Sequence, residues 1–584
     1  MSRASFLAIF VVAFLVLGPI PRQAAAQGKK FTPVTNQTLL NPSPDDWLML
    51  SRTFDEQRFS PLTQINRQTI AQLRMAWVRG MAPGVQESIP LEYQGTLYVI
   101  NAGAVIQALD ATNGDLIWEY RRKQPGEPGG SGGEAAARSK NLAIFDDLIF
   151  YTAPDGYLIA LDARTGKLRW ETMVTDPKNG VHTAGPLVVE GKVLTGRACR
   201  GSRTACFISA HDALTGKEVW KFYTTAAPGE PGGDTWGDAP VEKRIASPWG
   251  LPGSYDPVRK LVYWGIANPT PNMRMQRHNG NPDAISRSAP SELYGNSTVA
   301  LDPSTGKLAW YYQHLPGDDW DSDHDHERIL LRTALNPDPQ SVKWINPKIR
   351  PGEQRDIAVM VAEAGGIWAL DRSNGQFLWA TPFPYDTPDF DISRIDVETG
   401  KTYINWDKVL KKDGDRSVVC YYNTRSYWPT AYSPKTNSIY IPYADACVDM
   451  TANGPRFGVP RPGSDPKAFA GVARVNLGTG HVDWRHTQRA PGNGAMLATA
   501  GDLVFWGDLD RRFKAFDAES GKVLWETIVG GVVSVSNITY AVNGKQYVAV
   551  MTGDGQSGTA GLLSQVKELK PPRGHNAIYV FALP

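Results

Sequence analysis

The sequence predicts an all-β protein, an eight-bladed β-propeller whose blades are four-stranded antiparallel sheets that carry a tryptophan motif. The first observation behind this prediction is that the motif recurs along the chain. The second is the composition, since 56 Gly, 43 Pro and 18 Trp among 584 residues indicate many tight turns between short strands. The hydrophobic share of 42% and the charged share of 21% are those of a globular protein, and they exclude a disordered chain or a polytopic membrane protein.

Each copy of the motif contains Ala-x-Asp, a Gly four residues after the Asp, and a Trp four residues after the Gly. Apolar residues alternate before the Asp, which predicts a half-buried strand. The Asp and a following Thr or Ser favour a tight turn in which the Gly takes a positive φ. The first three motif tryptophans are 52 and 50 residues apart, the length of one four-stranded sheet. Seven copies, of which the one at Asn476 is degenerate, end at Trp118, Trp170, Trp220, Trp310, Trp379, Trp484 and Trp525.

The eighth blade is expected to combine both ends of the chain. Trp77 follows a strand-like segment with no turn motif before it. Residues 577–581 read as a final strand, so we expect them to complete the blade of Trp77 and close the ring. Longer gaps before Trp310 and before Trp484 predict insertions. Two separate β-sandwiches are the alternative architecture, and the repeat argues against it.

The first 26 residues are expected to be a secretory signal peptide, followed by a single propeller domain over residues 27–584. Arg3 provides a basic start, residues 6–17 are an unbroken apolar run, and residues 24–26 are alanines that place cleavage near Ala26. An apolar run of twelve residues is too short to span a membrane as a helix. An uncleaved anchor is the alternative.

Four cysteines follow the apolar run. An even number in an exported protein favours two disulfides, and three pairings are possible. The shortest loops give Cys199–Cys206 and Cys420–Cys447. The sequence contains no Cys-x-x-Cys-His motif, so no c-type haem is expected on this chain.

The densest acidic cluster lies in residues 317–327, which contain six carboxylates. The cluster comes soon after the motif that ends at Trp310. On an extended segment Asp321 and Asp323 point to the same side, and two carboxylates on one side suit Ca²⁺ or a similar ion. The alternative is a solvated acidic loop that binds nothing.

Three other residues are candidates for a site, although each has an ordinary structural explanation. Asn268 follows a predicted strand over residues 261–267, where its amide oxygen is available to a metal or belongs to a plain turn. Trp249 is placed either to stack on a planar ligand or to fill the core. Glu87 precedes a strand predicted over residues 91–100 and is otherwise a surface charge. The sequence shows no phosphate loop, nucleotide fingerprint or Ser-His-Asp order.

Several motifs, taken together, resemble the periplasmic quinoprotein alcohol dehydrogenases. They are residues 53–62 (TFDEQRFSPL), the repeats, residues 316–321 (PGDDWD) and residues 498–505 (ATAGDLVF). The motifs occur in order, and the resemblance covers about residues 40–584. It implies a propeller enzyme without a fused cytochrome c domain, which oxidises an alcohol with pyrroloquinoline quinone (PQQ) and a metal ion.

The resemblance gives each candidate residue a role. Asp321 matches the catalytic base, which accepts the hydroxyl proton while hydride passes to the quinone. Asn268, Asp321 and Asp323 match positions at the metal, which polarises the quinone carbonyl. Trp249 matches the ring that stacks on the quinone. The remaining matches near the cofactor are Glu87, Lys140, Thr183 and Ser247.

The sequence also departs from the family at the metal and above the quinone. The metal-ligand Glu of the family falls near Gly201, where there is no carboxylate, and we expect Arg200 to neutralise a quinone carboxylate. Glu363 stands where a basic residue is usual, and residues 133–138 lack the family's two adjacent cysteines. Because Asp323 adds one carboxylate while the Glu is missing, we expect Ca²⁺, with a lanthanide ion as the alternative.

A substrate larger than methanol or ethanol is expected. Asn272 and Asn493 stand where small-alcohol members of the family carry Trp, which leaves a wider and more polar pocket. We therefore expect a bulky or polar primary or secondary alcohol that is oxidised to an aldehyde or ketone. The alternative is that residues 126–133 or 274–287 fold in and fill the space.

The expected electron acceptor is a separate soluble cytochrome c or a similar protein, and the expected form is a monomer or homodimer in the periplasm. The net charge of +2 gives no electrostatic reason to expect nucleic acid as a partner, and no stable membrane insertion is expected. Two rival functions stay open: a PQQ-dependent sugar or aldose dehydrogenase, and a non-enzymatic propeller scaffold.

Overall fold

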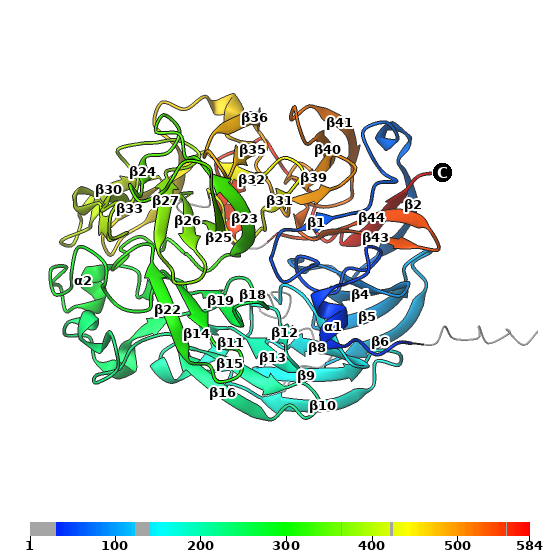
Figure 1. Cartoon of the computed structure of the whole chain (residues 1–584), viewed down its shortest axis with the longest axis horizontal. Helices are drawn as coiled ribbons and strands as arrows, with labels where there is room; N and C mark the ends of the chain where they lie inside the picture. The colour runs from blue at the N-terminus through cyan, green and yellow to red at the C-terminus, as the bar shows by residue number, and fades with distance from the viewer. Residues whose placement is uncertain (1–30, 123–138, 364, 421–423, 556) are drawn as a thin grey trace, which may run out of the picture. The chain divides into compact units, whose positions relative to one another are not determined.

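Eight β-sheets follow one another along the chain in the computed structural model (Figure 1). The structure describes residues 31–122, 139–363, 365–420, 424–555 and 557–584, and Pro33–Pro584 forms one compact unit. Each of the eight sheets contains four antiparallel strands, and two of them carry a fifth strand. The prediction of an eight-bladed all-β propeller is therefore confirmed. The expected signal peptide, residues 1–26, lies outside the described residues.

The first four blades each use strands in simple up-and-down order. Their strands are β3 (Leu91–Tyr93), β4 (Thr96–Asn101), β5 (Val105–Asp110) and β6 (Leu116–Arg121); β7 (Ala143–Phe145), β8 (Leu148–Thr152), β9 (Tyr157–Asp162) and β10 (Leu168–Met173); β12 (Leu187–Val189), β13 (Lys192–Thr195), β15 (Phe207–Asp212) and β16 (Glu218–Tyr223); β18 (Ser254–Asp256), β19 (Leu261–Gly265), β21 (Ser297–Leu301) and β22 (Leu308–Gln313).

The last four blades include the two sheets with a fifth strand. Their strands are β23 (Ile329–Leu335), β25 (Glu353–Val361), β26 (Ile367–Asp371), β27 (Phe377–Thr381) and β24 (Trp344–Ile345); β31 (Ala431–Ser433), β32 (Ser438–Ala444), β35 (Ala470–Asn476) and β36 (Val482–Gln488); β1 (Phe59–Ser60), β38 (Leu497–Thr499), β39 (Leu503–Gly507), β40 (Arg512–Asp517) and β41 (Val523–Ile528); β43 (Asn537–Val542), β44 (Lys545–Thr552), β45 (Ala577–Ala582) and β2 (Arg74–Gly80).

The tryptophan motif joins each blade to the next. Trp118 lies on an outermost strand, and a Cβ added to Gly166 of the following blade would come within 2.4 Å of its ring. The indole Nε1 of Trp118 donates to the Ala163 carbonyl at 2.9 Å. Gly166 is therefore required both by its φ of 68° and by this close approach. The same contact joins Trp77–Gly114, Trp170–Gly216, Trp220–Gly306, Trp310–Gly375 and Trp484–Gly521.

One junction replaces the indole with an aliphatic side chain. Strand β24 pairs with β27 and places Ile345 opposite Trp379, which is fully buried. Val342, just before β24, then takes the place of the indole, because a Cβ on Gly480 would lie 2.1 Å from its side chain. The insertion thus changes the chemistry of the contact without changing the position of the turn.

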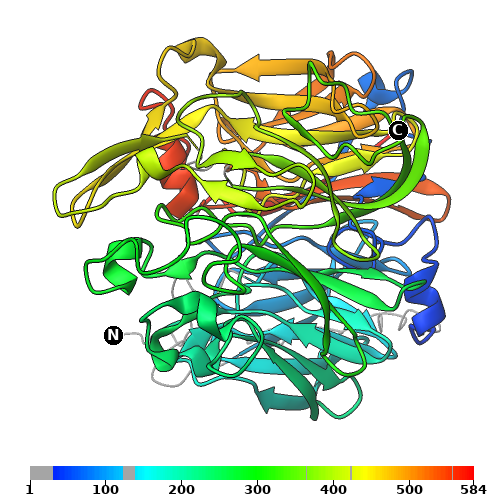
Figure 2. The same cartoon turned by 60° about the vertical axis from the view of Figure 1, so that its left-hand side comes forward.

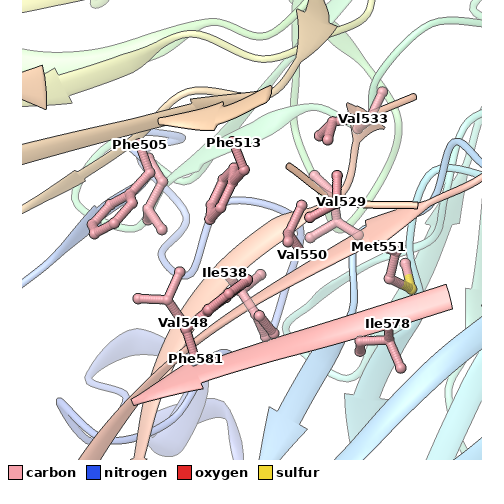
Figure 3. Packing of buried hydrophobic residues seen from close by; sticks show 14 of the residues in the cluster. Phe505, Phe513, Val529, Val533, Ile538, Val548, Val550, Met551, Ile578 and Phe581 are labelled. Carbon is pink, nitrogen blue, oxygen red and sulfur yellow. The ribbon is translucent and has the colours of Figure 1, made fainter. Parts of the chain in front are cut away.

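Both ends of the chain close the ring, as the sequence predicts. β2 pairs with β45 in antiparallel register, with Trp77 opposite Val580. Trp525 of the preceding blade packs edge-on against Phe581, with ring centroids 5.3 Å apart. Figure 3 shows Phe513 and Phe581 within the hydrophobic cluster between these last two blades, where removal of apolar surface from water stabilises the closure.

Insertions between the blade strands add short strands and loops outside the eight sheets, and some of them project from the blades (Figure 2). Some lie in the gaps that the sequence predicts, before Trp310 and before Trp484, and others lie before Trp220 or after Trp484. Their strands are β11 (Gly180–Val181), β14 (Ala198–Cys199), β17 (Ile245–Ala246), β20 (Pro269–Thr270), β28 (Ile392–Ile395), β29 (Thr402–Ile404), β30 (Arg416–Val419), β33 (Ala446–Thr451), β34 (Arg456–Pro460), β37 (Asn493–Gly494) and β42 (Ser534–Val535).

Helices are few and short. The α-helices are α1 (Asn36–Leu40), α2 (Arg274–Arg277) and α3 (Ser557–Leu563), and the 3₁₀ turns are η1 (Ile70–Gln72), η3 (Arg203–Ala205), η4 (Gly233–Trp236), η5 (Val241–Lys243), η6 (Trp406–Lys408) and η7 (Pro466–Ala468). Across the described ranges, no helix has the length and apolar character needed to cross a membrane.

Two disulfides tie down insertions. Cys199–Cys206 closes the connection from β14 to β15, and Cys420–Cys447 joins the end of β30 to β33. These are the two pairings that the shortest loops predict. The second disulfide fixes a three-stranded sheet, β30–β33–β34, that stands outside the blades.

Candidate active site

One cavity of about 320 Å³ collects nearly all of the candidate residues. Its walls come from connections between blade strands, including the pairs β11–β14 and β17–β20. Another cavity, of about 370 Å³ near Leu563 and Pro571, contains none of them. The residues that line the smaller cavity are Glu87, Lys140, Val181, Thr183, Ala198, Arg200, Ser247, Trp249, Ala267, Asn268, Thr270, Asn272, Asp321 and Asp323.

Asp323 links the aromatic wall of the cavity to the amide wall. The indole Nε1 of Trp249 donates to its Oδ2 at 3.0 Å, and the backbone N–H of Asn268 donates to its Oδ1 at 3.2 Å. Burial raises the pKa of Asp323 well above its ordinary value, and the nearby carboxylates of Asp325 and Glu363 raise it further. The carboxylate thus lies in a region of excess negative charge, where a cation would stabilise its ionised form.

Asp321 presents its carboxylate at the opening of this region. Its backbone has a φ of 75°, in the left-handed region, and its side chain is 39% exposed. The guanidinium of Arg456 contacts Oδ2 at 2.8 Å. A carboxylate that is held by a cation and open to a cavity has the placement expected of a general base.

Glu87, Lys140 and Tyr427 form a buried triad next to Trp249. The Lys140 ammonium lies 2.5 Å from Glu87 Oε2, and the Tyr427 hydroxyl donates to Glu87 Oε1 at 3.0 Å. The ammonium also lies 3.9 Å from the centre of the Tyr427 ring, while the edge of Tyr427 packs against Trp249. The sequence predicts Glu87 and Lys140 near a cofactor but not Tyr427, which no local motif marks.

Hydroxyl and amide groups complete the walls. Thr183 donates its hydroxyl to the Trp249 carbonyl at 2.8 Å, and Ser247 accepts the backbone N–H of Cys199 at 3.0 Å. The side-chain amide of Asn268 donates to Asn272 Oδ1 at 3.2 Å. These bonds fix the positions of Trp249 and Asn268 relative to the cavity.

The acidic segment is not a solvated loop. Asp318 and Asp319 are fully buried, and burial raises the pKa of Asp318 to about 7 and that of Asp319 to about 6. Asp319 accepts the backbone N–H groups of Arg274 at 2.6 Å and of Leu410 at 2.7 Å, so it joins two insertions. Of the six carboxylates in the segment, only Asp321 and Asp323 line the cavity.

Asn493, which the sequence predicts in the substrate pocket, is not among the residues that line this cavity. It is fully buried in β37, and its side-chain amide donates to Thr559 Oγ1 at 2.8 Å. The short parallel pairing of β37 with β42 fixes this orientation toward α3. Residues 126–133 and 133–138, which also enter the sequence predictions, lie outside the described residues.

Comparison with known proteins identifies the family. Residues 47–382 and 468–548 match the β-propeller domain of the PQQ glucose/ethanol/alcohol dehydrogenases. The chain belongs to the PQQ-dependent quinoprotein alcohol dehydrogenases. It is 30% identical to quinohemoprotein alcohol dehydrogenase ADH-IIG of Pseudomonas putida, over 90% of this chain and 75% of that protein. It is 26% identical to quinoprotein alcohol dehydrogenase PedH of P. putida, over 95% and 93% of the two chains.

The fold agrees with solved members of this group. A europium-containing methanol dehydrogenase superimposes with a TM-score of 0.78 at 27% identity, over 93% of this chain and 99% of that one. The resemblance that the sequence motifs indicate is thus confirmed at the level of family and fold.

The cavity fits a metal ion of the kind that prefers oxygen ligands. Asp321 and Asp323 offer carboxylates and Asn268 offers an amide, which are hard donors. Within the part of the chain that the structure describes, no three His, Cys, Asp or Glu side chains form a ready-made metal site. A metal held here would therefore need the amide and oxygens of the cofactor in addition to the carboxylates.

The cavity also fits a planar, multiply charged cofactor. Trp249 supplies an aromatic surface, Lys140 and Arg200 supply cations, and Thr183 and Ser247 supply hydroxyl groups. PQQ is a flat quinone with three carboxylates, so this combination of groups matches its chemistry.

Proposed function

We propose that this quinoprotein oxidises a primary or secondary alcohol to an aldehyde or ketone with PQQ and a metal ion. One observation carries the proposal: Asp321, Asp323, Asn268 and Trp249 line the same cavity although they come from three separate segments of the chain. A non-enzymatic propeller would need only the blade motifs. The alternative of a sugar or aldose dehydrogenase uses the same cofactor, and the substrate series below distinguishes it.

In the reaction, Asp321 accepts the proton of the substrate hydroxyl through its partly exposed carboxylate. When bound, PQQ would supply the two-electron acceptor for the hydride of the carbinol carbon, and a metal would supply a Lewis acid. Trp249 would hold the flat cofactor, and its bond to Asp323 keeps the aromatic wall and the candidate metal ligands in one arrangement. The carbinol carbon becomes a carbonyl carbon, so the proton and the electron pair are both accounted for.

The first test is Asp321→Asn, which keeps the shape of the side chain and removes the base. We expect kcat to fall by at least about a hundredfold, the usual contribution of a general base, with the fold unchanged by circular dichroism. The measurement is dye reduction by the purified chain with PQQ, Ca²⁺ and a panel of alcohols. A variant that keeps kcat near the wild-type value contradicts the assignment.

The substrate is proposed to be bulky or polar. Asn272 lines the cavity beside Asn268 and is partly exposed, so its amide is available to a hydroxylated substrate. Asn272→Trp should lower kcat/KM for a cyclic secondary alcohol and for a polyol by about tenfold or more, and affect methanol least. If methanol is the best wild-type substrate, or if the bulky alcohols are unaffected by the variant, the open pocket is wrong. An aldose preferred over every simple alcohol would favour the sugar dehydrogenase alternative.

Ca²⁺ is the proposed metal, and a lanthanide ion is the alternative. Two carboxylates, Asp321 and Asp323, line the cavity together with Asn268, and the guanidinium of Arg456 pairs with Asp321. Two carboxylate ligands and an amide suit a divalent ion. Turnover that needs lanthanum and never responds to Ca²⁺ would reverse this choice.

We also propose that the protein works in the periplasm and passes electrons to a separate cytochrome c or similar protein. Two disulfides support an oxidising compartment. The sequence offers no Cys-x-x-Cys-His motif for a haem of its own. Signal-peptide cleavage near Ala26 is tested by N-terminal sequencing of the exported protein.

A further inference from the structure

Arg456 reaches the candidate site from outside the propeller blades. It begins β34 of the small sheet β30–β33–β34, which the disulfide Cys420–Cys447 ties down. Figure 2 shows the β33–β34 hairpin in yellow, projecting from the blades, and helix α3 lies against β34. The guanidinium of Arg456 is thus carried by an element that is separate from the walls of the cavity.

Three carboxylates crowd together where Arg456 arrives. The backbone N–H of Asp323 donates to Glu363 Oε2 at 3.2 Å, and the backbone N–H of Glu363 donates to the Asp323 carbonyl at 3.1 Å. Both side chains are 7% exposed, and Asp321 acts on each of them as a like charge.

Two other nearby cations are engaged elsewhere. Lys140 is paired with Glu87, and Arg328 donates to the carbonyls of His324 and His326. Among residues that the structure describes, Arg456 is the cation that forms an ion pair with one of the three carboxylates, at 2.8 Å from Asp321. It also acts electrostatically on Glu363.

We propose that Arg456 is a fixed countercharge of the metal site, which holds Asp321 in place and tunes the site to a divalent ion. The guanidinium offsets about one of the negative charges that Asp321, Asp323, Glu363 and the neighbouring Asp325 supply. This inference rests on the proposed function, because it assigns Arg456 a role toward the metal that the function requires. Arg456 is a positioning residue, since it acts through Asp321.

The charge of the ion makes the proposal measurable. Coulomb energy is proportional to the charge of the ion. A countercharge therefore raises log Kd for a trivalent ion by about 1.5 times as much as it raises log Kd for a divalent ion. A residue that only supports the fold would change both affinities in the same direction and by similar amounts, and would lower them when removed. Removal of a countercharge raises both affinities, and that of the trivalent ion more.

The experiment uses the full chain, saturated with PQQ and stripped of metal, and titrates Ca²⁺ and La³⁺ by calorimetry. For Arg456→Gln we expect Kd to fall by about tenfold for Ca²⁺ and about thirtyfold for La³⁺, while kcat with an alcohol falls by about tenfold. Arg456→Lys keeps the charge, so both Kd values should stay within about threefold of wild type. Tighter metal with slower turnover is a combination that structural damage does not produce.

Glu363→Gln provides the opposite change. It removes one negative charge and still accepts from the Asp323 N–H, so we expect weaker binding of both ions, and of La³⁺ more than Ca²⁺. The double variant Arg456→Gln with Glu363→Gln should return both affinities to near wild type. Arg416→Gln is the matched control: it removes an Arg on β30 of the same sheet that is 71% exposed, and it should change neither affinity by more than about twofold.

Unchanged or lowered affinities in Arg456→Gln, or equal shifts for the two ions, would overturn the role of Arg456. A wild-type chain that turns over no alcohol would overturn the proposed function instead. The titrations still decide about Arg456 in that case, because they need no turnover.

Discussion

The insertion that carries Asn268 and Asn272 is held by one buried carboxylate, that of Glu292. Removing the charge of this carboxylate should lower the free energy of unfolding by a measurable amount. Glu292 accepts from Arg277 Nε and Nη2, both at 2.7 Å, and from His278 Nε2 at 2.9 Å. Arg277 in turn donates to the carbonyls of Pro271 at 2.7 Å and Asn272 at 2.6 Å. Glu292→Gln should therefore loosen the wall of the cavity as well as destabilise the fold.

The magnitude follows from the pKa of the group. Burial raises the pKa of Glu292, but the charges and hydrogen bonds of Arg277 and His278 lower it by more. The net effect is a pKa that falls from 4.5 to about 2. A difference of this size corresponds to about 3 kcal/mol of stability at neutral pH. This agrees with the cost of about 3–5 kcal/mol for breaking a buried ion pair by removing one partner.

The sign of the pH dependence is fixed by the lowered pKa. The contribution of Glu292 is fully present above about pH 4.5, the unfolded-state value, and is lost as the pH falls toward 2. The difference in Tm between wild type and Glu292→Gln should be constant from pH 6 to pH 8. Between pH 6 and pH 3 it should shrink by the equivalent of about 2 kcal/mol.

The assay combines thermal unfolding across this pH range with hydrogen exchange of residues 268–296 at pH 7. Asp283→Asn is the matched control, because it breaks the exposed pair with Arg287 in the same insertion and should cost less than about 1 kcal/mol. A Tm difference that is the same at pH 3 and pH 7, or exchange in Glu292→Gln no faster than in Asp283→Asn, would refute the reasoning.

Two further substitutions test the blade junction and the buried triad. Gly166→Ala should lower the free energy of unfolding by about 1–3 kcal/mol more than Gly544→Ala does. Both glycines have a positive φ, but only an alanine at position 166 would crowd the indole of Trp118. Equal losses of Tm in the two variants would show that the indole contact is not the cause. Lys140→Met should cost about 3–5 kcal/mol by leaving Glu87 buried without its ion pair, and adding Glu87→Gln should recover most of the lost Tm; no recovery would place the cost in packing instead.

The blades could be predicted because their determinants are local. An Asp, a Gly and a Trp at a spacing of four specify a turn and the contact with the next blade within one repeat. The exception at Gly480 could not be predicted, since Val342 and β24 lie in an insertion far before it in the sequence. Ring closure was predictable because Trp77 follows a strand-like segment with no turn motif before it, and residues 577–581 read as a final strand.

The candidate site could be predicted only where a family motif marks a residue. Tyr427 contacts Glu87 across 340 positions of sequence, and Arg456 contacts Asp321 across 135, so neither contact has a local signal. The bond from Asn493 to Thr559 likewise has no local signal, because it depends on the short pairing of β37 with β42. Long-range packing decides these cases.

The acidic segment shows why composition alone cannot separate a structural carboxylate from a catalytic one. The carboxylate oxygens of Asp318 and Asp319 accept hydrogen bonds from backbone N–H groups. The bonds to Asp318 shape the turn, and those to Asp319 join two insertions. That framework leaves Asp321 with a left-handed φ and an open carboxylate, and it places Asp323 against Trp249. Removing a framework carboxylate should therefore disturb the site through geometry, whereas Asp321→Asn should remove the proposed base and weaken the proposed metal site directly. The buried acids shape the turn from which the Asp321 carboxylate reaches the cavity.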